Sequence, residues 1–384
     1  MSSNTTILVF TDWYLPGYKA GGPIRSIANM VTRLHLSFSI VTSNKDHDSD
    51  EPYPCVSTNR WVHGPQNERV MYLPLEEQTT QRIREIIQES DYDFIYLNSL
   101  FSSKFTLKPL IAARRLRKLE KVILAPRGML KPGALTVKAG KKKVFLNAAR
   151  LMGLYRGLTW HGTNETEADE IRQHFGKNVN VKVAPNLVVM PKENRALPTK
   201  VEGAMRVVTI ARISPEKNIT QSIDWMLKAM TEDAKLEWDI YGTQENAEYF
   251  SECQSLLSST KHEVNLKGHI SPEEIKTTLG KYHFFYLPTL GENFGHAIIE
   301  ALMHGLPVII SDMTPWKGLK NQKAGWELPL KEEEFVAVLR ESLAMNGEDF
   351  LSLHEGARTL GATIANRSND VRANYELFRT KDLD

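Results

Sequence analysis

The chain has 384 residues, with 48 Lys and Arg, 46 Asp and Glu, and a formal net charge of +2 at pH 7. Hydrophobic residues make up 41% and charged residues 24%, which excludes a collagen, a coiled coil and a wholly disordered chain. Cys55 and Cys253 are too few for a disulfide framework or a zinc site made of cysteines, and they favour a reducing compartment. We find no signal-peptide pattern and no apolar window of about 18 residues, so we expect a cytoplasmic protein without a membrane-spanning helix.

Short apolar runs alternate with segments of helical spacing in the first half of the chain. The expected strands lie at 6–11, 38–42, 94–97, 121–125, 159–161 and 181–184. One expected helix begins near Ile24, and three others span 79–89, 107–119 and 164–175. This alternation predicts a parallel sheet that helices cover on both faces.

A polar stretch with two prolines, residues 191–203, is typical of a linker, and the alternation restarts after it. Strands are expected at 206–211, 236–241, 264–267, 284–287 and 307–311, and helices at 219–230, 247–257, 272–279, 297–303, 331–344 and over the last thirty or so residues. We therefore predict two α/β units, 1–190 and 191–365, and a C-terminal helix within 366–384 that packs back on the first unit. Ligands of open α/β sheets bind beyond the carboxyl ends of the strands, so a cleft between two such units is the expected site.

Positive charge is concentrated in one segment. Residues 104–156 carry 15 Lys and Arg against one acid, Glu120, whereas 1–103 and 157–384 have net charges of −4 and −8. The segment includes Lys138, Lys141, Lys142 and Lys143. A solvated helix face is the plain alternative, but pairs at i,i+4 cannot neutralise so large an excess. We expect an anionic partner, either a membrane surface or a phosphorylated acceptor; few aromatic residues and an acidic remainder of the chain argue against nucleic acid.

Residues 288–312, PTLGENFGHAIIEALMHGLPVIISD, are the most informative stretch. They predict a strand end, a loop that carries Glu292, and a helix that begins near Phe294 and carries Glu300. Eight helical residues rise about 12 Å, so the two carboxylates would meet different parts of one extended ligand. Glu292 would accept a sugar hydroxyl, Glu300 both hydroxyls of a ribose, and the backbone of 293–295 would donate to phosphate. Without further motifs, two surface glutamates would be the plainer interpretation.

Two more loops follow predicted strands. In ARISPEKN (211–218), Arg212 and Lys217 would stabilise the charge of a departing diphosphate, while Ser214 and Pro215 equally fit a capped helix start. In YLPGYKAGGP (14–23), the Gly21–Gly22 pair lets the backbone approach a phosphate or a sugar. The G-x-G-x-x-G spacing is absent, which disfavours a dinucleotide-dependent oxidoreductase.

In this order the motifs resemble the large retaining glycosyltransferase family numbered 4, whose members have two Rossmann-like units in the GT-B architecture. Further matching segments are GHISPEEI (268–275), APRGMLKPGAL (125–135) and NETEADEI (164–171). TPWKGL (314–319), followed by Gly and Trp at 325–326, looks like a late loop of members that build bacterial surface polysaccharide. Together the motifs cover most of the chain.

The resemblance implies roles for individual residues. Arg212 and Lys217 would hold the donor diphosphate, Glu300 the ribose and Glu292 the transferred sugar. The remaining donor-binding positions would be Gly21, Gly22, Gly242, His269, Asn293, Phe294 and Gly295. Many members have a histidine where this chain has Arg127, and because arginine is no base at physiological pH we expect Arg127 to act as an electrostatic clamp. His161 and His296 are expected to be structural.

The expected reaction is metal-independent transfer of a sugar from a UDP- or GDP-linked donor, with retention of configuration. No cofactor is needed, since the nucleotide sugar is a substrate. The acceptor would be a saccharide or a lipid-linked saccharide, with Lys138, Lys141, Lys142 and Lys143 near an anionic membrane surface on the inner face of the plasma membrane. DHDSD (46–50) mimics a metal motif, but a solvated loop explains it better. A catalytically silent nucleotide-sugar-binding protein and a GT-B epimerase remain alternatives.

Overall fold

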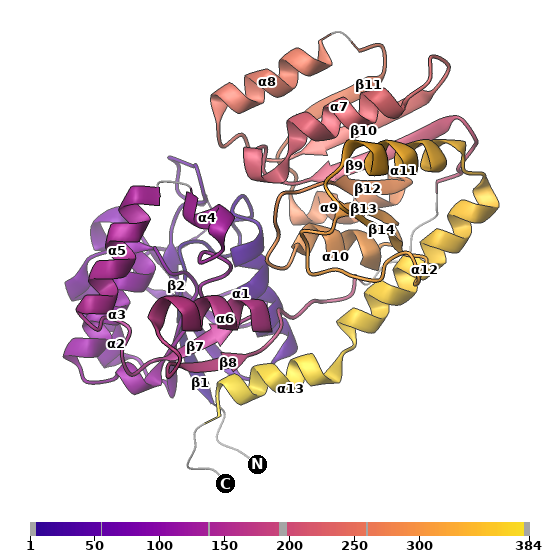
Figure 1. Cartoon of the computed structure of the whole chain (residues 1–384). Helices are drawn as coiled ribbons and strands as arrows, with labels where there is room; N and C mark the ends of the chain where they lie inside the picture. Colours follow the sequence, from indigo (N-terminus) through magenta and orange to yellow (C-terminus); the bar gives the residue numbers. More distant parts are fainter. Residues whose placement is uncertain (1–4, 55, 137–138, 192–197, 259, 380–384) are drawn as a thin grey trace. The chain divides into compact units, whose positions relative to one another are not determined.

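The computed structural model describes residues 5–54, 56–136, 139–191, 198–258 and 260–379 (Figure 1). It divides into two compact units, of which the first comprises Met1–Val189 with Arg367–Asp384, and the second Met190–Asn366. Much of the expected linker, 192–197, lies outside the described residues. No helix within the described ranges is long and apolar enough to cross a membrane.

The first unit contains one mixed sheet in the strand order β3-β4-β2-β1-β5-β6-β7-β8. The strands are β1 (Thr6–Phe10), β2 (Ser37–Ser43), β3 (Trp61–His63), β4 (Arg69–Leu73), β5 (Phe94–Leu97), β6 (Val122–Leu124), β7 (Thr159–Gly162) and β8 (Asn180–Val183). The helices are α1 (Gly22–Arg33), α2 (Thr80–Glu89), α3 (Lys108–Arg115), α4 (Pro132–Thr136), α5 (Ala139–Leu151), α6 (Glu165–Phe175) and α13 (Ser368–Leu377), with short helical turns η1 (Leu75–Glu77), η2 (Ser103–Leu107) and η3 (Leu119–Lys121).

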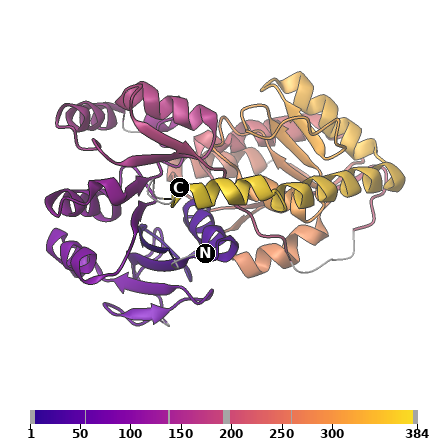
Figure 2. The same cartoon turned by 90° about the horizontal axis from the view of Figure 1, so that it is seen from below.

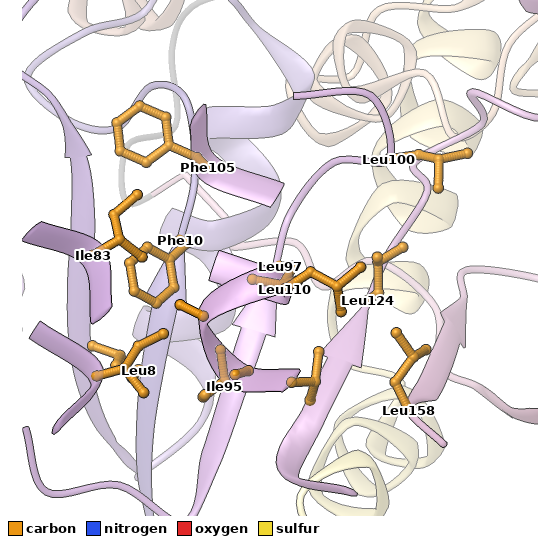
Figure 3. Close-up of a cluster of buried hydrophobic side chains, with 14 of the residues drawn as sticks. Leu8, Phe10, Ile83, Ile95, Leu97, Leu100, Phe105, Leu110, Leu124 and Leu158 are labelled. Carbon is orange, nitrogen blue, oxygen red and sulfur yellow. The ribbon is translucent and has the colours of Figure 1, made fainter. Parts of the chain in front are cut away.

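Alternation along β1 explains why this sheet is covered on both faces. Leu8 and Phe10 point into the cluster that α2, α3 and α5 cover, and Figure 3 shows them among leucines of the neighbouring strands. Ile7 and Val9 point to the opposite face, where α1 and Leu377 of α13 pack. Period-two alternation with apolar side chains on both faces is the pattern of a buried central strand.

The second unit contains a sheet in the order β11-β10-β9-β12-β13-β14, and its pairings are parallel. The strands are β9 (Ala204–Ile210), β10 (Lys235–Tyr241), β11 (Glu263–Gly268), β12 (Phe284–Leu287), β13 (Val308–Ser311) and β14 (Gly325–Leu328). The helices are α7 (Ile219–Ala229), α8 (Ala247–Leu257), α9 (Pro272–Thr278), α10 (His296–Met303), α11 (Glu332–Ala344) and α12 (Gly347–Ala365), with turns η4 (Pro215–Lys217) and η5 (Leu279–Lys281). Figure 2 shows each unit from a second direction.

One glycine sets the distance between two helices of the second unit. A Cβ at Gly361 of α12 would lie 2.7 Å from the backbone of Met303 in α10, closer than real Cβ contacts. The missing side chain therefore allows the two helices to pack backbone against backbone, and this anchors α10, the helix that carries Glu300.

The structure corrects several expectations. A wholly parallel first sheet is wrong, because β3 pairs antiparallel with β4, and neither strand was expected. The helix expected over 107–119 is in fact the turn η2 followed by α3, which ends at Arg115. The strand β14 was also not predicted, because a glycine and a glutamate among its four residues interrupt the apolar pattern of a buried strand. The C-terminal helix α13 packs beside β8, and Asn374 Nδ2 donates to the carbonyl of Pro185, just after that strand, at 2.8 Å.

Candidate active site

The strand order of the second sheet creates one special position. From β9 the chain proceeds outward to β10 and β11, and the later strands lie on the other side of β9, beginning with β12. The loops after β9 and β12 therefore lead away in opposite directions, which makes this position a topological switch point, where open parallel sheets bind ligands. Two bonds to the Glu216 carbonyl join these loops, from Leu290 N (2.9 Å) and from Thr289 Oγ1 (3.1 Å).

Lys217 and Glu292 meet at this switch point. Lys217 Nζ lies 2.7 Å from Glu292 Oε1, and the two side chains are 9% and 17% exposed. The turn η4 and left-handed Asn218 (φ 58°) place Lys217 there, and Asn218 Nδ2 donates to the Pro288 carbonyl at 3.0 Å. Both charged residues were expected to bind one ligand, and the structure brings them together. Ser214 occupies the N-cap position of η4 and Pro215 follows it, as expected, although within the described chain the Ser214 side chain makes no capping bond.

Arg212 lies in the same loop and is held by carboxylates. Its guanidinium contacts Glu245 at 2.5 Å and Glu216 at 3.4 Å, while 43% of the side chain stays exposed. Burial lowers the pKa of Arg212, but Glu245 first, then Glu216 and Glu292, raise it above its ordinary value. The cation is therefore permanent, and it is oriented before any ligand binds.

The loop between β12 and α10 is pinned at two backbone positions. Glu292 N donates to the Met313 carbonyl at 3.2 Å, and Trp316 Nε1 donates to the Phe294 carbonyl at 2.6 Å. Gly295 precedes α10 with φ 77°, and a Cβ there would lie 2.9 Å from Ile298 Cδ1. The left-handed φ favours glycine in this turn, which gives the 293–295 backbone a defined path. The helix starts at His296, whose ring contacts Phe294 (centroids 4.8 Å apart).

Two other donor-binding candidates of this unit, Gly242 and His269, follow strands at the same edge of the sheet. Glu300 is half-buried in α10, four residues after the helix begins at His296. Gly242 follows β10, where a Cβ would lie 1.7 Å from the Ala211 carbonyl oxygen, and its N–H donates to the Gly268 carbonyl at 2.7 Å. His269 follows β11 and is exposed. In the structure, Gly242 serves close packing of loops.

The first unit has its own switch point, between β1 and β5. Asn98, just after β5, connects the loops: its N–H donates to the Phe10 carbonyl (3.1 Å) and its Nδ2 to the Pro23 carbonyl (3.1 Å). Gly21 (φ 63°) and Gly22 lie at the start of α1 beside these contacts. Arg127 Nε donates to Asn98 Oδ1 at 2.7 Å, so the arginine belongs to the same edge of the sheet.

Arg127 is the outer end of a buried hydrogen-bond chain. His161 Nε2 donates to the Ala184 carbonyl (2.8 Å), because a carbonyl can only accept, which makes Nδ1 the acceptor from Tyr96 O–H (2.7 Å). Arg127 Nη2 donates to the same phenol oxygen at 2.8 Å. Burial, and then Arg127, lower the pKa of His161 to about 3, while burial raises the pKa of Tyr96 to about 12. His161 is therefore a neutral structural residue, as expected, and it orients the clamp candidate.

Two carboxylates shape these loops in a way that the sequence did not predict. Glu167 is fully buried and accepts from Gly128 N (2.5 Å), Thr163 N (2.8 Å) and Thr163 Oγ1 (2.6 Å), which holds the turn that bears Arg127. Asp46 accepts from Tyr18 N (2.9 Å) and Lys19 N (3.2 Å) in the glycine loop. The solvated-loop interpretation of 46–50 is therefore wrong for Asp46. Among the described residues, no three His, Cys, Asp or Glu side chains gather as a metal site would require.

The four lysines expected near a membrane surface differ in their surroundings. Lys138 lies outside the described residues. Lys142 is directed inward, with Nζ 2.6 Å from the Ala134 carbonyl and 5.4 Å from the centre of the Phe101 ring. Lys141 and Lys143 are exposed on α5. Lys142 therefore holds α5 against its neighbours, and the two other described lysines face solvent.

Residues 191–346 match the family model described as glycosyl transferases group 1. The GtfA subunit of a UDP-N-acetylglucosamine–peptide N-acetylglucosaminyltransferase from Streptococcus agalactiae is 23% identical over 235 residues, which are 56% of this chain and 44% of that protein. The chain thus spans less than half the length of the curated relatives it matches.

Solved structures resemble the chain over nearly its full length. Sucrose-phosphate synthase from Thermosynechococcus elongatus has a TM-score of 0.68 at 17% identity, with 98% of each chain covered. Anabaena HepE in complex with UDP and glucose has a TM-score of 0.67 at 13% identity, again with 98% of each chain covered. At this identity the likeness shows the fold, which is the GT-B fold of two Rossmann-like units.

Proposed function

We propose that this chain, in which residues 191–346 match the group 1 glycosyltransferase model and which has the GT-B fold, moves a sugar from a UDP- or GDP-linked donor to a saccharide or lipid-linked saccharide. We assign it to the family numbered 4 and to the synthesis of a surface polysaccharide such as O-antigen, capsule or exopolysaccharide. The observation that carries the proposal is the contact between Lys217 and Glu292 at the switch point of the second sheet, with Arg212 in the same loop as Lys217. HepE, with the same fold, is described in complex with UDP and glucose.

The charges at the switch point suit a nucleoside diphosphate as leaving group. Lys217 offers three donors, of which Glu292 takes one and the Gly291 carbonyl accepts another at 3.5 Å, and Arg212 offers five around its two carboxylate contacts. The diphosphate would take the remaining donors, with the 293–295 backbone at the start of α10 assisting. Glu292, already anchored by Lys217, would accept from a hydroxyl of the transferred sugar, and Glu300 from the ribose.

The proposed reaction retains the configuration of the sugar. The bond between the anomeric carbon and the diphosphate oxygen breaks, and the acceptor oxygen attacks the oxocarbenium-like carbon from the same face. The acceptor's proton moves to the departing phosphate oxygen. Arg212 and Lys217 stabilise the charge that develops there, so the proposal requires neither a metal nor a cofactor. Arg127, held by Asn98 and Tyr96, would act as a clamp on phosphate or sugar.

A panel of nucleotide sugars, read by released UDP or GDP, tests the proposal. Lys217→Ala and Glu292→Ala should each reduce turnover at least about 100-fold, as loss of charge stabilisation in a transition state does, without unfolding. Lys228→Ala, at an exposed lysine of α7 in the same unit, is the matched control. Binding without nucleotide release would favour the silent protein, and acceptor-independent conversion of one nucleotide sugar into another would favour the epimerase. Unchanged turnover in both site variants would refute the proposed site.

The excess of positive charge in 104–156 favours an acceptor with a lipid phosphate, at the inner face of the plasma membrane. The comparison of a saccharide on a diphospholipid with the same free saccharide tests this part. The lipid-linked form should have the lower KM, and equal KM values would leave the free saccharide as the acceptor.

A further inference from the structure

The helix α5 exposes apolar side chains that the core does not use. Val144 is 70% exposed and Leu151 90%, and Met152, just beyond the helix, is 63% exposed. Val144 and Leu151 are seven residues apart, two helical turns, so they lie on one face of the helix. Large aliphatic groups in this arrangement are typical of a surface that is covered in function.

The buried side of α5 fixes which face points outward. Leu146 and Ala149 are 8% and 1% exposed, and Phe145 packs edge-on against Phe101 with ring centroids 5.8 Å apart. Lys142 adds its bond to the Ala134 carbonyl. The helix therefore cannot rotate to bury Val144 and Leu151 without giving up these contacts. Figure 1 shows α5 among the outer helices of the first unit, beside α3.

Positive charges flank the apolar centre on both sides. At about 100° per residue, Lys143 and Arg150 lie on one side of Val144 and Leu151, and Lys141 lies on the other. All three basic side chains are exposed. At the end of the helix, Arg114 of α3 donates to the carbonyl of Gly153 at 3.2 Å, which brings another cation beside Met152.

We propose that Val144, Leu151 and Met152 insert into the interface of an anionic lipid bilayer while Lys141, Lys143, Arg150 and Arg114 contact the headgroups. Apolar groups between basic flanks match the two layers of a bilayer surface, where basic heads stay with phosphate and aliphatic groups reach the acyl boundary. This inference rests on the proposed function only in that a lipid-linked acceptor gives the enzyme a reason to dock. We call these seven residues the α5 surface.

Co-sedimentation of the full chain with vesicles tests the α5 surface. Binding should occur on equimolar phosphatidylcholine–phosphatidylglycerol vesicles and be much weaker on phosphatidylcholine alone. Lys141→Glu with Lys143→Glu should weaken it at least about 30-fold, at roughly 5-fold for each charge lost. Lys276→Glu with Lys281→Glu, at exposed lysines of the second unit, changes the net charge equally and should leave binding unchanged.

The apolar part has its own variants. Val144→Ser with Leu151→Ser should weaken binding at least about 10-fold, whereas Leu75→Ser, at a 62% exposed leucine of the same unit, should not. Unchanged binding in the serine pair would overturn insertion, and equal losses in both charge pairs would overturn a localised surface. If the chain binds soluble heparin more tightly than vesicles, and the serine pair leaves heparin binding unchanged, the partner is a soluble polyanion and the bilayer proposal is overturned. Donor hydrolysis without vesicles should be unchanged in every variant, so failure of the proposed transferase activity is seen separately.

Discussion

Acid should destabilise the first unit through His161, and a His161→Gln variant isolates this effect. The imidazole is fully buried, with Tyr96 O–H on Nδ1 and the Ala184 carbonyl on Nε2. Its pKa in the folded chain is about 3, below the ordinary 6.5, because burial and the Arg127 charge oppose a second proton. Gln keeps one acceptor and one donor at the position but does not titrate.

The sign and size follow from proton linkage. Between the two pKa values the unfolded chain binds one more proton at this site than the folded chain, so folding stability falls as the pH falls. The contribution is fully present above the unfolded pKa, and well below it the loss approaches about 1.4 kcal/mol per pH unit. Between about pH 5.5 and 4.5, the natural protein should therefore lose roughly 1 kcal/mol more than His161→Gln.

Equilibrium urea unfolding of the full chain, followed by tryptophan fluorescence at several pH values, measures the difference. His35→Gln removes an exposed histidine of the same unit and should show the pH dependence of the natural protein. Parallel pH dependences for the natural protein and His161→Gln would refute a buried neutral His161, and with it the assigned direction of the hydrogen bond from Tyr96 to His161.

Three further changes probe the loops around the sites. Trp316→Phe removes the bond to the Phe294 carbonyl and should raise KM for the donor about 5-fold, at ~1 kcal/mol, with a smaller change in kcat; a change in kcat alone would contradict a positioning role. Glu167→Ala leaves three buried donors without an acceptor and should lower the free energy of unfolding in urea by about 3 kcal/mol. Glu165→Ala, at an exposed glutamate, should lower it by less than about 1 kcal/mol. Equal losses would refute the role of the buried carboxylate. Gly361→Ala forces α12 away from Met303 and should lower Tm by several degrees, for a cost of about 2 kcal/mol; an unchanged Tm would show that the helices separate freely.

Local patterns were enough for most of the elements. β5, β12 and α8 have the bounds that apolar spacing predicts, and Asn164 caps α6 by accepting from Glu167 N at 2.8 Å, as its place before the helix indicates. These features depend on neighbours within about four residues, so the chain encodes them locally. β3 and the basic helix α5 lacked such a signal, because one is three residues long and the other is exposed along an unusually charged face.

The charged residues of the candidate site were recognisable from their motifs, but their meeting was decided by the order of strands. Lys217 and Glu292 are 75 residues apart and touch only because β12 pairs with β9. The roles of Glu167, Asp46 and Tyr96 were hidden in the sequence for the same reason. Each bonds to a residue far away along the chain, namely Gly128, Tyr18 and Arg127 respectively. Spacing along the chain specifies helices, strands and turns, whereas sheet pairing and burial select which charges become neighbours, which stay neutral and which remain open to a ligand.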